Sequence, residues 1–210
     1  MRLPDKVRIA GDRTVGEWFA LRAILTGDAS PNAWDSAFSD YFKTRIQTRY
    51  FDPIEALSKL HKKGEGFSIV AIQCCLIEFF GSTLEGKTYR FNPGKKHKLG
   101  DFEYDGSKEM FTRFLVTATP FASVFNEALA KDFYEGVRCG LLHEARTKKG
   151  WTIRTREKPG AFLDVATKTL WRDDFQRAFY EFVDWYRSAL LTTPAYKQAF
   201  IRKFDGLCED

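Results

Sequence analysis

Apolar residues recur at helical spacing along most of the chain. The clearest case is residues 173–191, where large apolar side chains follow one another at intervals of three or four. They are Phe175, Phe179, Phe182, Val183, Tyr186 and Leu190. This stripe predicts a helix that packs one face against a core. Residues 66–82 are apolar almost all round, which predicts a central, buried helix, and a final helix is expected at 194–205.

Three further helices are predicted before residue 64 from their start signals. Each begins with a small polar residue that can cap a helix, and in two of them proline follows at the first helical position. The caps are Thr14, Ser30 and Asp52, and the prolines are Pro31 and Pro53. We expect these helices to form an N-terminal helical extension over residues 1–64, followed by a helical domain over residues 65–210.

The middle of the chain adds shorter helices and two strands. After a glycine-rich, basic connection at 84–106, Ser107 begins a short helix, and a longer helix is expected from about 121 to 145. The segments "GWTIRT" and "AFLDVATKTLW" predict two strands of a small hairpin that turns at Pro159-Gly160. The predicted fold class is mainly α, a helical bundle with a small β-hairpin.

The composition of the chain predicts a folded protein, and its apolar segments bear on where in the cell we expect it. Of the 210 residues, 44% are hydrophobic and 16% aromatic, which is enough for a substantial core. The longest apolar segment, 67–80, is shorter than a membrane span, and no basic-then-apolar signal opens the chain. We therefore expect a cytoplasmic protein without a membrane partner. The four cysteines form no CxxC pair and the three histidines are scattered, so no metal site or other cofactor is expected.

Positive charge is concentrated in two short segments. The net charge of the chain is +5, but residues 87–98 carry five Lys or Arg and no acid, and residues 138–158 carry seven against two acids. The remainder of the chain is net acidic. Such clustering indicates an anionic partner, first of all a nucleic acid, although solvated basic loops produce the same pattern.

One basic segment also contains a pair of residues that suits RNA cleavage. In "EGVRCGLLHEARTKKGW", residues 135–151, Arg138 precedes His143 by five positions. A histidine can accept the proton of a 2′-hydroxyl at neutral pH, and an arginine can stabilise the charge that develops on the phosphate. Only RNA carries the 2′-hydroxyl, so this chemistry would not extend to DNA.

The spacing of the pair limits how one chain can use it. On an ideal helix, five positions place Arg138 and His143 about 140° apart, so they do not share a face. Gly140 lies between them and weakens a helix by up to about 1 kcal/mol. A shared ligand would need a helix that ends or bends, or a second copy of the chain. Two other interpretations remain open: an ion-paired arginine with a histidine at a helix C-terminus, or a Cys139–His143 thiol couple.

The segment "FYEGVRCGLLHEA" resembles the signature of the HEPN superfamily, an arginine followed after four to six residues by a histidine at the end of a late helix. The order of helices and the following hairpin are also similar, over roughly residues 66–205. The resemblance implies a helical bundle that dimerises to form one composite cleft, with Arg138 and His143 as catalytic residues. It implies a metal-independent endoribonuclease of a bacterial toxin–antitoxin or antiviral defence system, with an antitoxin or defence protein as a further partner.

Residues around the pair extend this hypothesis to RNA binding. Tyr134 lies one turn before Arg138 and could stack on a base or pack into the bundle. Three cations just beyond the pair could hold phosphates or line a solvated loop. They are Arg146, Lys148 and Lys149, to which a folded-over connection would add Lys95, Lys96 and Lys98. Cys139 stands where active family members often have a polar residue, and a catalytically inactive RNA- or protein-binding module is the alternative.

Overall fold

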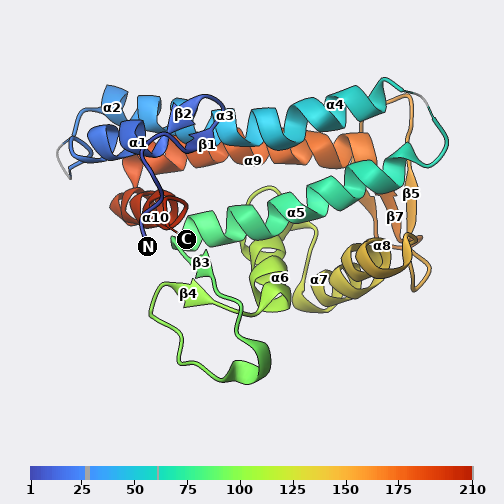
Figure 1. The fold of residues 1–210 in the computed structure, drawn as a ribbon. Helices are drawn as coiled ribbons and strands as arrows, with labels where there is room; N and C mark the ends of the chain where they lie inside the picture. Colours follow the sequence, from blue (N-terminus) through green and yellow to red (C-terminus); the bar gives the residue numbers. More distant parts are fainter. Residues whose placement is uncertain (27–28, 61, 210) are drawn as a thin grey trace. The chain divides into compact units, whose positions relative to one another are not determined.

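The computed structural model describes residues 1–26, 29–60 and 62–209. Within these residues the fold is mostly helical with three small sheets, and its mainly α character is as expected (Figure 1). Its internal contacts divide the chain into two compact units. The first unit comprises residues 1–51, 82–106 and 186–210, and the second comprises 52–81 and 107–185. These interleaved units do not coincide with the expected boundary at residue 64.

The first unit opens with a hairpin that leads directly into a helix. Strand β1 (Arg8–Ala10) pairs antiparallel with β2 (Arg13–Thr14), and α1 (Val15–Arg22) follows without a gap. The predicted cap at Thr14 is confirmed. Its hydroxyl accepts a hydrogen bond from the Glu17 N–H at 3.3 Å, and the Glu17 carboxylate accepts one from the Thr14 N–H at 2.9 Å. This reciprocal capping box fixes the start of the helix.

The next helix is longer than the sequence pattern predicted. Ser30 caps it as expected, because its hydroxyl accepts a hydrogen bond from the Ala33 N–H at 3.3 Å. From there the chain stays helical to residue 58, through the following successive segments. These are α2 (Pro31–Ala37), η1 (Phe38–Lys43), α3 (Thr44–Ile46), η2 (Gln47–Phe51) and α4 (Asp52–Ser58).

An α-helical segment does begin at Asp52 as predicted, but it continues directly from η2 instead of starting after a break. A proline inside an α-helix lacks the N–H of the backbone ladder, and its ring clashes with the carbonyl four residues earlier. The wider π-helical turn of η2 ends at Phe51, two residues before Pro53, and accommodates the proline without ending the helix. A proline preceded by a cap-like residue thus does not mark a break in the helix here.

The C-terminal helix completes the first unit. Helix α10 (Pro194–Gly206) places Phe200 and Phe204 against Trp18, with ring centroids 6.1 and 5.2 Å apart. The indole N–H of Trp18 donates a hydrogen bond to Asp205 at 2.9 Å. The connection expected to be irregular contains a small parallel pair and a 3-10 turn. They are β3 (Thr88–Tyr89), β4 (Glu103–Tyr104) and η3 (Pro93–Lys95).

The second unit is built on a phenylalanine core. The expected central helix is α5 (Glu65–Glu85), and the apolar stripe belongs to α9 (Arg172–Thr192); each continues into the first unit. Phe80 of α5 and Phe182 of α9 lie with ring centroids 4.7 Å apart. Helix α6 (Ser107–Thr117) adds Phe114, whose ring meets that of Phe182 edge to face at 5.0 Å. Both helix predictions are confirmed.

The strands of the second unit pair differently from the prediction. Strand β5 (Thr152–Arg154) lies parallel to β7 (Thr169–Trp171), and the hairpin is formed by β6 (Leu163–Asp164) with β7. The sheet order is β5-β7-β6. Pro159-Gly160 therefore lies in the crossover between β5 and β6 rather than at a hairpin turn. The hairpin turn is at residues 165–168, between β6 and β7, so the predicted turn at Pro159-Gly160 was wrong. The parallel pairing of β5 with β7 depends on contacts that a local signal does not report.

Candidate functional site

The motif lies on a helix of the second unit with an irregular middle. Its parts are α7 (Glu127–Phe133), the π-helical η5 (Tyr134–Arg138) and α8 (Cys139–Glu144). The expected start near residue 121 was wrong: a 3-10 turn, η4 (Phe121–Ser123), comes first, and the helix begins after Asn126. The Asn126 side chain accepts a hydrogen bond from the Leu129 N–H at 2.9 Å. The helix ends at Ala145, which has a left-handed conformation with φ 53°.

Arg138 and His143 occupy different environments on this helix. Arg138 is half-buried, and its guanidinium lies 5.3 Å from the centre of the Tyr134 ring. Burial raises the pKa of the Cys75 thiol on α5, and the positive charge of Arg138 opposes that rise. His143 is exposed in the last helical turn. Because the intervening residues are helical, the two side chains leave the axis about 140° apart.

Tyr134 packs inside the unit. Only 9% of its surface is exposed, and its ring meets Phe111 edge to face at 5.2 Å. Burial raises the pKa of its phenol. The packing alternative therefore describes this residue, and its ring supports the guanidinium of Arg138 instead of offering a free face to a base.

The three cations beyond the motif are paired with acids. Arg146 lies 3.1 Å from Glu144, which also pairs with Lys148. Lys149 pairs with Glu135 and lies 3.7 Å from Asp132. These contacts are on the surface, where each is weak, but together they reduce the positive field that the sequence suggests.

Glu135 is held by two lysines. It accepts hydrogen bonds from Lys108, at 2.6 Å, and from Lys149. These bonds, that from Lys108 first, lower the pKa of the Glu135 carboxyl to about 2. The carboxylate therefore stays charged across the physiological range and continues to compensate the basic segment.

Two glycines let the basic segment fold back along the helix. The Lys148 N–H donates a hydrogen bond to the Gly136 carbonyl at 2.7 Å. A Cβ on Gly136 would lie 2.8 Å from Nε1 of Trp151, and one on Gly140 would lie 2.5 Å from the Arg146 carbonyl oxygen. The low helix propensity of glycine suggested an interruption at Gly140, but the helix continues through this residue. Gly140 provides room for the returning chain.

Sequence reasoning missed the acids that hold this segment. Asp132 accepts hydrogen bonds from the Trp151 indole at 2.9 Å and from Lys168 at 2.8 Å. Asp132 and Glu135 are three positions apart, so they lie on neighbouring positions of one helix face. The three-residue spacing of these two acids, together with the lysines of the following loop, was the feature of the sequence from which the ion pairs could have been predicted.

The remaining predicted residues are Cys139 and three lysines of the 84–106 connection. Cys139, which follows the motif arginine, is half-buried. Lys95, Lys96 and Lys98 are exposed in the first unit, whereas the motif belongs to the second. Among the described residues, no group of three or more His, Cys, Asp or Glu is placed to hold a metal ion.

One helix of the described part of the chain, α5, is long and apolar enough to cross a membrane by length and composition. Within that apolar window, 56% is buried in the structure, and the core helix of a soluble protein meets the same criteria. Comparison of the chain with models of known families, with curated proteins and with solved structures gives no match.

Proposed function

We propose that this protein is a metal-independent endoribonuclease of the HEPN type. In the reaction it catalyses, a 2′-hydroxyl of the RNA attacks the adjacent phosphate of the same strand. One observation supports it above all: on one helix, Arg138 is held against Tyr134 while His143 is exposed at the helix end. A histidine that solvent can reach is able to exchange protons with a substrate. An arginine that is held in place needs little reorganisation to meet a developing charge.

Because the side chains of Arg138 and His143 leave the helix in different directions, we infer that the active site forms in a homodimer. Since one helix does not direct Arg138 and His143 to one point, each site would take one residue from each of two chains. A two-fold dimer presents the same patch twice and forms two such sites. His143 takes the proton of the 2′-hydroxyl, whose oxygen bonds to phosphorus as the P–O5′ bond breaks, and Arg138 stabilises the charge on the phosphate. The departing 5′-oxygen takes a proton from water, which leaves a 2′,3′-cyclic phosphate and a 5′-hydroxyl. The biological setting would be bacterial antiviral defence or a toxin–antitoxin pair, with a cognate protein partner.

A catalytically inactive module that binds RNA or a protein is the second candidate. Two observations favour it. Cys139 is a weak hydrogen-bonding group at the position after the arginine. The cations at 146, 148 and 149 are compensated by Glu144, Glu135 and Asp132. If this second function is correct, RNA should bind in a salt-sensitive way, the binding should persist in His143→Ala, and no RNA should be cleaved.

The first test is RNA cleavage in excess EDTA. We expect cleavage by the unaltered chain, products that end in a 2′,3′-cyclic phosphate, and a loss of at least about a hundredfold in Arg138→Ala and in His143→Ala. Arg8→Ala and His97→Ala are matched controls, since both residues are exposed and lie in the first unit. Cleavage that neither motif substitution reduces would refute the site.

Mixing the two inactive variants tests the composite site. If each site takes Arg138 from one chain and His143 from the other, half of the dimers in an equal mixture contain both variants, and each of these has one intact site. The mixture should then regain about a quarter of the unaltered activity. If cleavage is genuine but mixing restores none, each site is built within one chain.

A further inference from the structure

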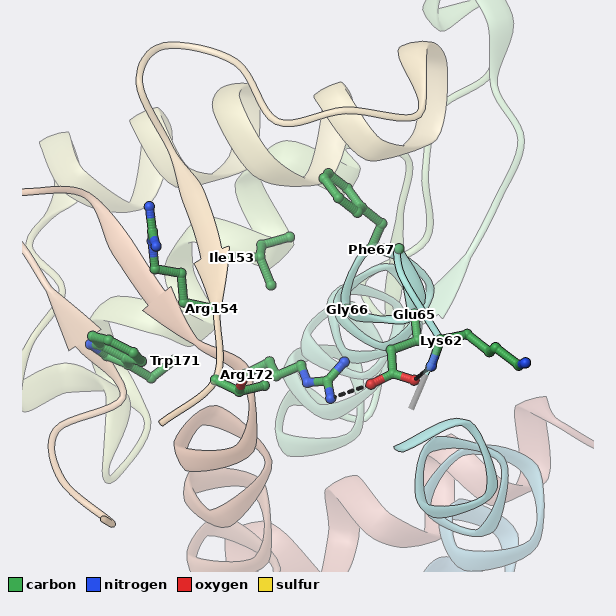
Figure 2. Close-up of a pocket in the computed structure, with 10 residues that line it drawn as sticks. Lys62, Glu65, Gly66, Phe67, Ile153, Arg154, Trp171 and Arg172 are labelled. Atoms are coloured by element: carbon green, nitrogen blue, oxygen red, sulfur yellow. Dashed lines mark hydrogen bonds and ion pairs between the residues drawn. The ribbon is translucent and has the colours of Figure 1, made fainter. Parts of the chain in front are cut away.

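A cavity of about 450 Å³ lies in the second unit, where α5 begins and β7 leads into α9 (Figure 2). Its size falls within the range of small-molecule sites. It shares no residue with the motif. The lining residues that carry the argument are Lys62, Glu65, Gly66, Phe67, Ile153 and Arg172.

Arg172 is a buried cation with unused hydrogen-bonding capacity. Its side chain is only 9% exposed, and its Nη2 donates a hydrogen bond to Glu65 at 2.7 Å. Its Nε lies 3.4 Å from Asp173 without forming a hydrogen bond. The Nη1 group has no acceptor in the described part of the chain. The atom of Arg172 that is buried without a partner is Nε, whereas Nη1 is open to the cavity and can meet a ligand there.

The first turn of α5 supports the same position. The Glu65 and Phe67 N–H groups are bonded to carbonyls of the preceding turn, whereas within the described residues the Gly66 N–H has no acceptor. A Cβ on Gly66 would lie 3.4 Å from Nη1 of Arg172 and 3.3 Å from Cγ2 of Ile153. The absence of a side chain here keeps the helix end open beside the guanidinium. The N-terminus of a 21-residue helix favours negative charge.

The cavity also has an apolar wall. In Figure 2, Ile153 and Phe67 face each other above the Arg172–Glu65 pair. Phe67 is 40% exposed, although it is a large apolar side chain in the first turn of the most apolar helix. Arg154 and Trp171 lie together to the other side of β5, and the side chain of Lys62 points away from Arg172 (Figure 2).

We propose that this cavity binds a phosphate monoester that carries an aromatic group. The phosphate contacts Nη1 of Arg172 and the Gly66 N–H, and the aromatic group lies against Phe67 and Ile153. Cations outnumber carboxylates among the lining residues, and Arg172 is the one beside the Gly66 N–H. The single carboxylate is already engaged by Arg172. This site depends on neither the motif nor the proposed cleavage of RNA.

Calorimetric titration of the full chain with phenyl phosphate tests the proposal, with inorganic phosphate and phenol as separate arms. We expect phenyl phosphate to bind more tightly than either. Arg172→Lys keeps the charge and can still pair with Glu65 but removes the guanidinium fork, and should weaken binding about tenfold or more. Phe67→Ala should weaken phenyl phosphate roughly five- to tenfold and leave inorganic phosphate unchanged.

Lys158→Gln is the matched control, because Lys158 is exposed and does not line the cavity. It should bind as the unaltered chain does. If Arg172→Lys is not folded, the double variant Arg172→Gln/Glu65→Gln removes the ion pair without leaving a lone charge, and it should lose binding of both phosphates. Absence of binding at millimolar phenyl phosphate overturns the proposal. So does equal weakening by Lys158→Gln, which would indicate diffuse charge attraction.

Discussion

Substitution of Gly136 by alanine tests how the basic segment is held on the motif helix. The new Cβ would lie 2.8 Å from Nε1 of Trp151, closer still to its Cδ1, and 3.1 Å from the Lys148 carbonyl oxygen. The Trp151 ring is only 3% exposed and has little freedom to move. It meets Phe133 edge to face at 5.1 Å, and its N–H is bonded to Asp132 at 2.9 Å.

The expected magnitude follows from two opposed effects. Overpacking of a well-packed interior costs about 1–3 kcal/mol. Alanine in place of a helical glycine contributes about 1 kcal/mol in the other direction. Because the new Cβ would lie less than 3 Å from two atoms of a buried ring, the overpacking cost should fall in the upper part of its range, about 2–3 kcal/mol. Gly136→Ala should therefore lower the free energy of unfolding by about 1–2 kcal/mol. For a chain of this length that corresponds to a fall in Tm of roughly 2–8 °C.

Urea unfolding, followed by far-UV circular dichroism, measures the effect, and Trp151→Val provides the background that isolates it. Valine ends before the ring atoms that Gly136 faces, so the clash is removed. In that background Gly136→Ala should be neutral or slightly stabilising, since only the helix propensity of alanine remains. An equal loss of stability in both backgrounds would show that the clash with Trp151 is not the cause.

Two further outcomes follow from the same helix. Asn126→Ala removes the cap of the Leu129 N–H and should lower the free energy of unfolding by about 1 kcal/mol, measured by urea unfolding; an unchanged midpoint would contradict the cap. The pKa of Glu135 is about 2 when folded, against an ordinary value of 4.5, so its stabilisation is complete above about pH 5 and is lost as the pH falls toward 2. The stability difference between the unaltered chain and Glu135→Gln should shrink over that interval, and a constant difference would refute the two lysine contacts as its source.

The parts of the fold that depend on local patterns were predictable. The stripe of α9 and the apolar length of α5 are properties of consecutive residues, and the caps at Thr14 and Ser30 act within three positions. The failures arose where a local signal was overruled. Pro53 reads as a helix start, but a π-helical turn carries the helix through it. The pairing of β5 with β7 is parallel and non-local, so a turn signal between them was misleading.

The candidate site shows the same limit. The sequence identifies the cations that follow the motif, but it does not show that Lys149 forms ion pairs with Glu135 and Asp132. These pairs depend on the chain folding back after Ala145, where Gly136 and Gly140 leave room for it. Only in the folded chain do Glu135 and Asp132 meet Lys149. Net charge over a stretch of sequence therefore overstated the field that a ligand would meet.

The interleaving of the two units has a consequence for synthesis of the chain. Trp18 packs against residues of α10 that are more than 180 positions away, with the hydrogen bond to Asp205 spanning 187. Ribosomes add roughly 5–20 residues per second, so the apolar face of α1 is synthesised roughly 10–40 s before its partner helix. During that interval the core of the first unit is incomplete, and its exposed apolar side chains can associate with other proteins. Expression should then depend on chaperones, and a fragment that begins at residue 65 would leave Phe200 and Phe204 without Trp18.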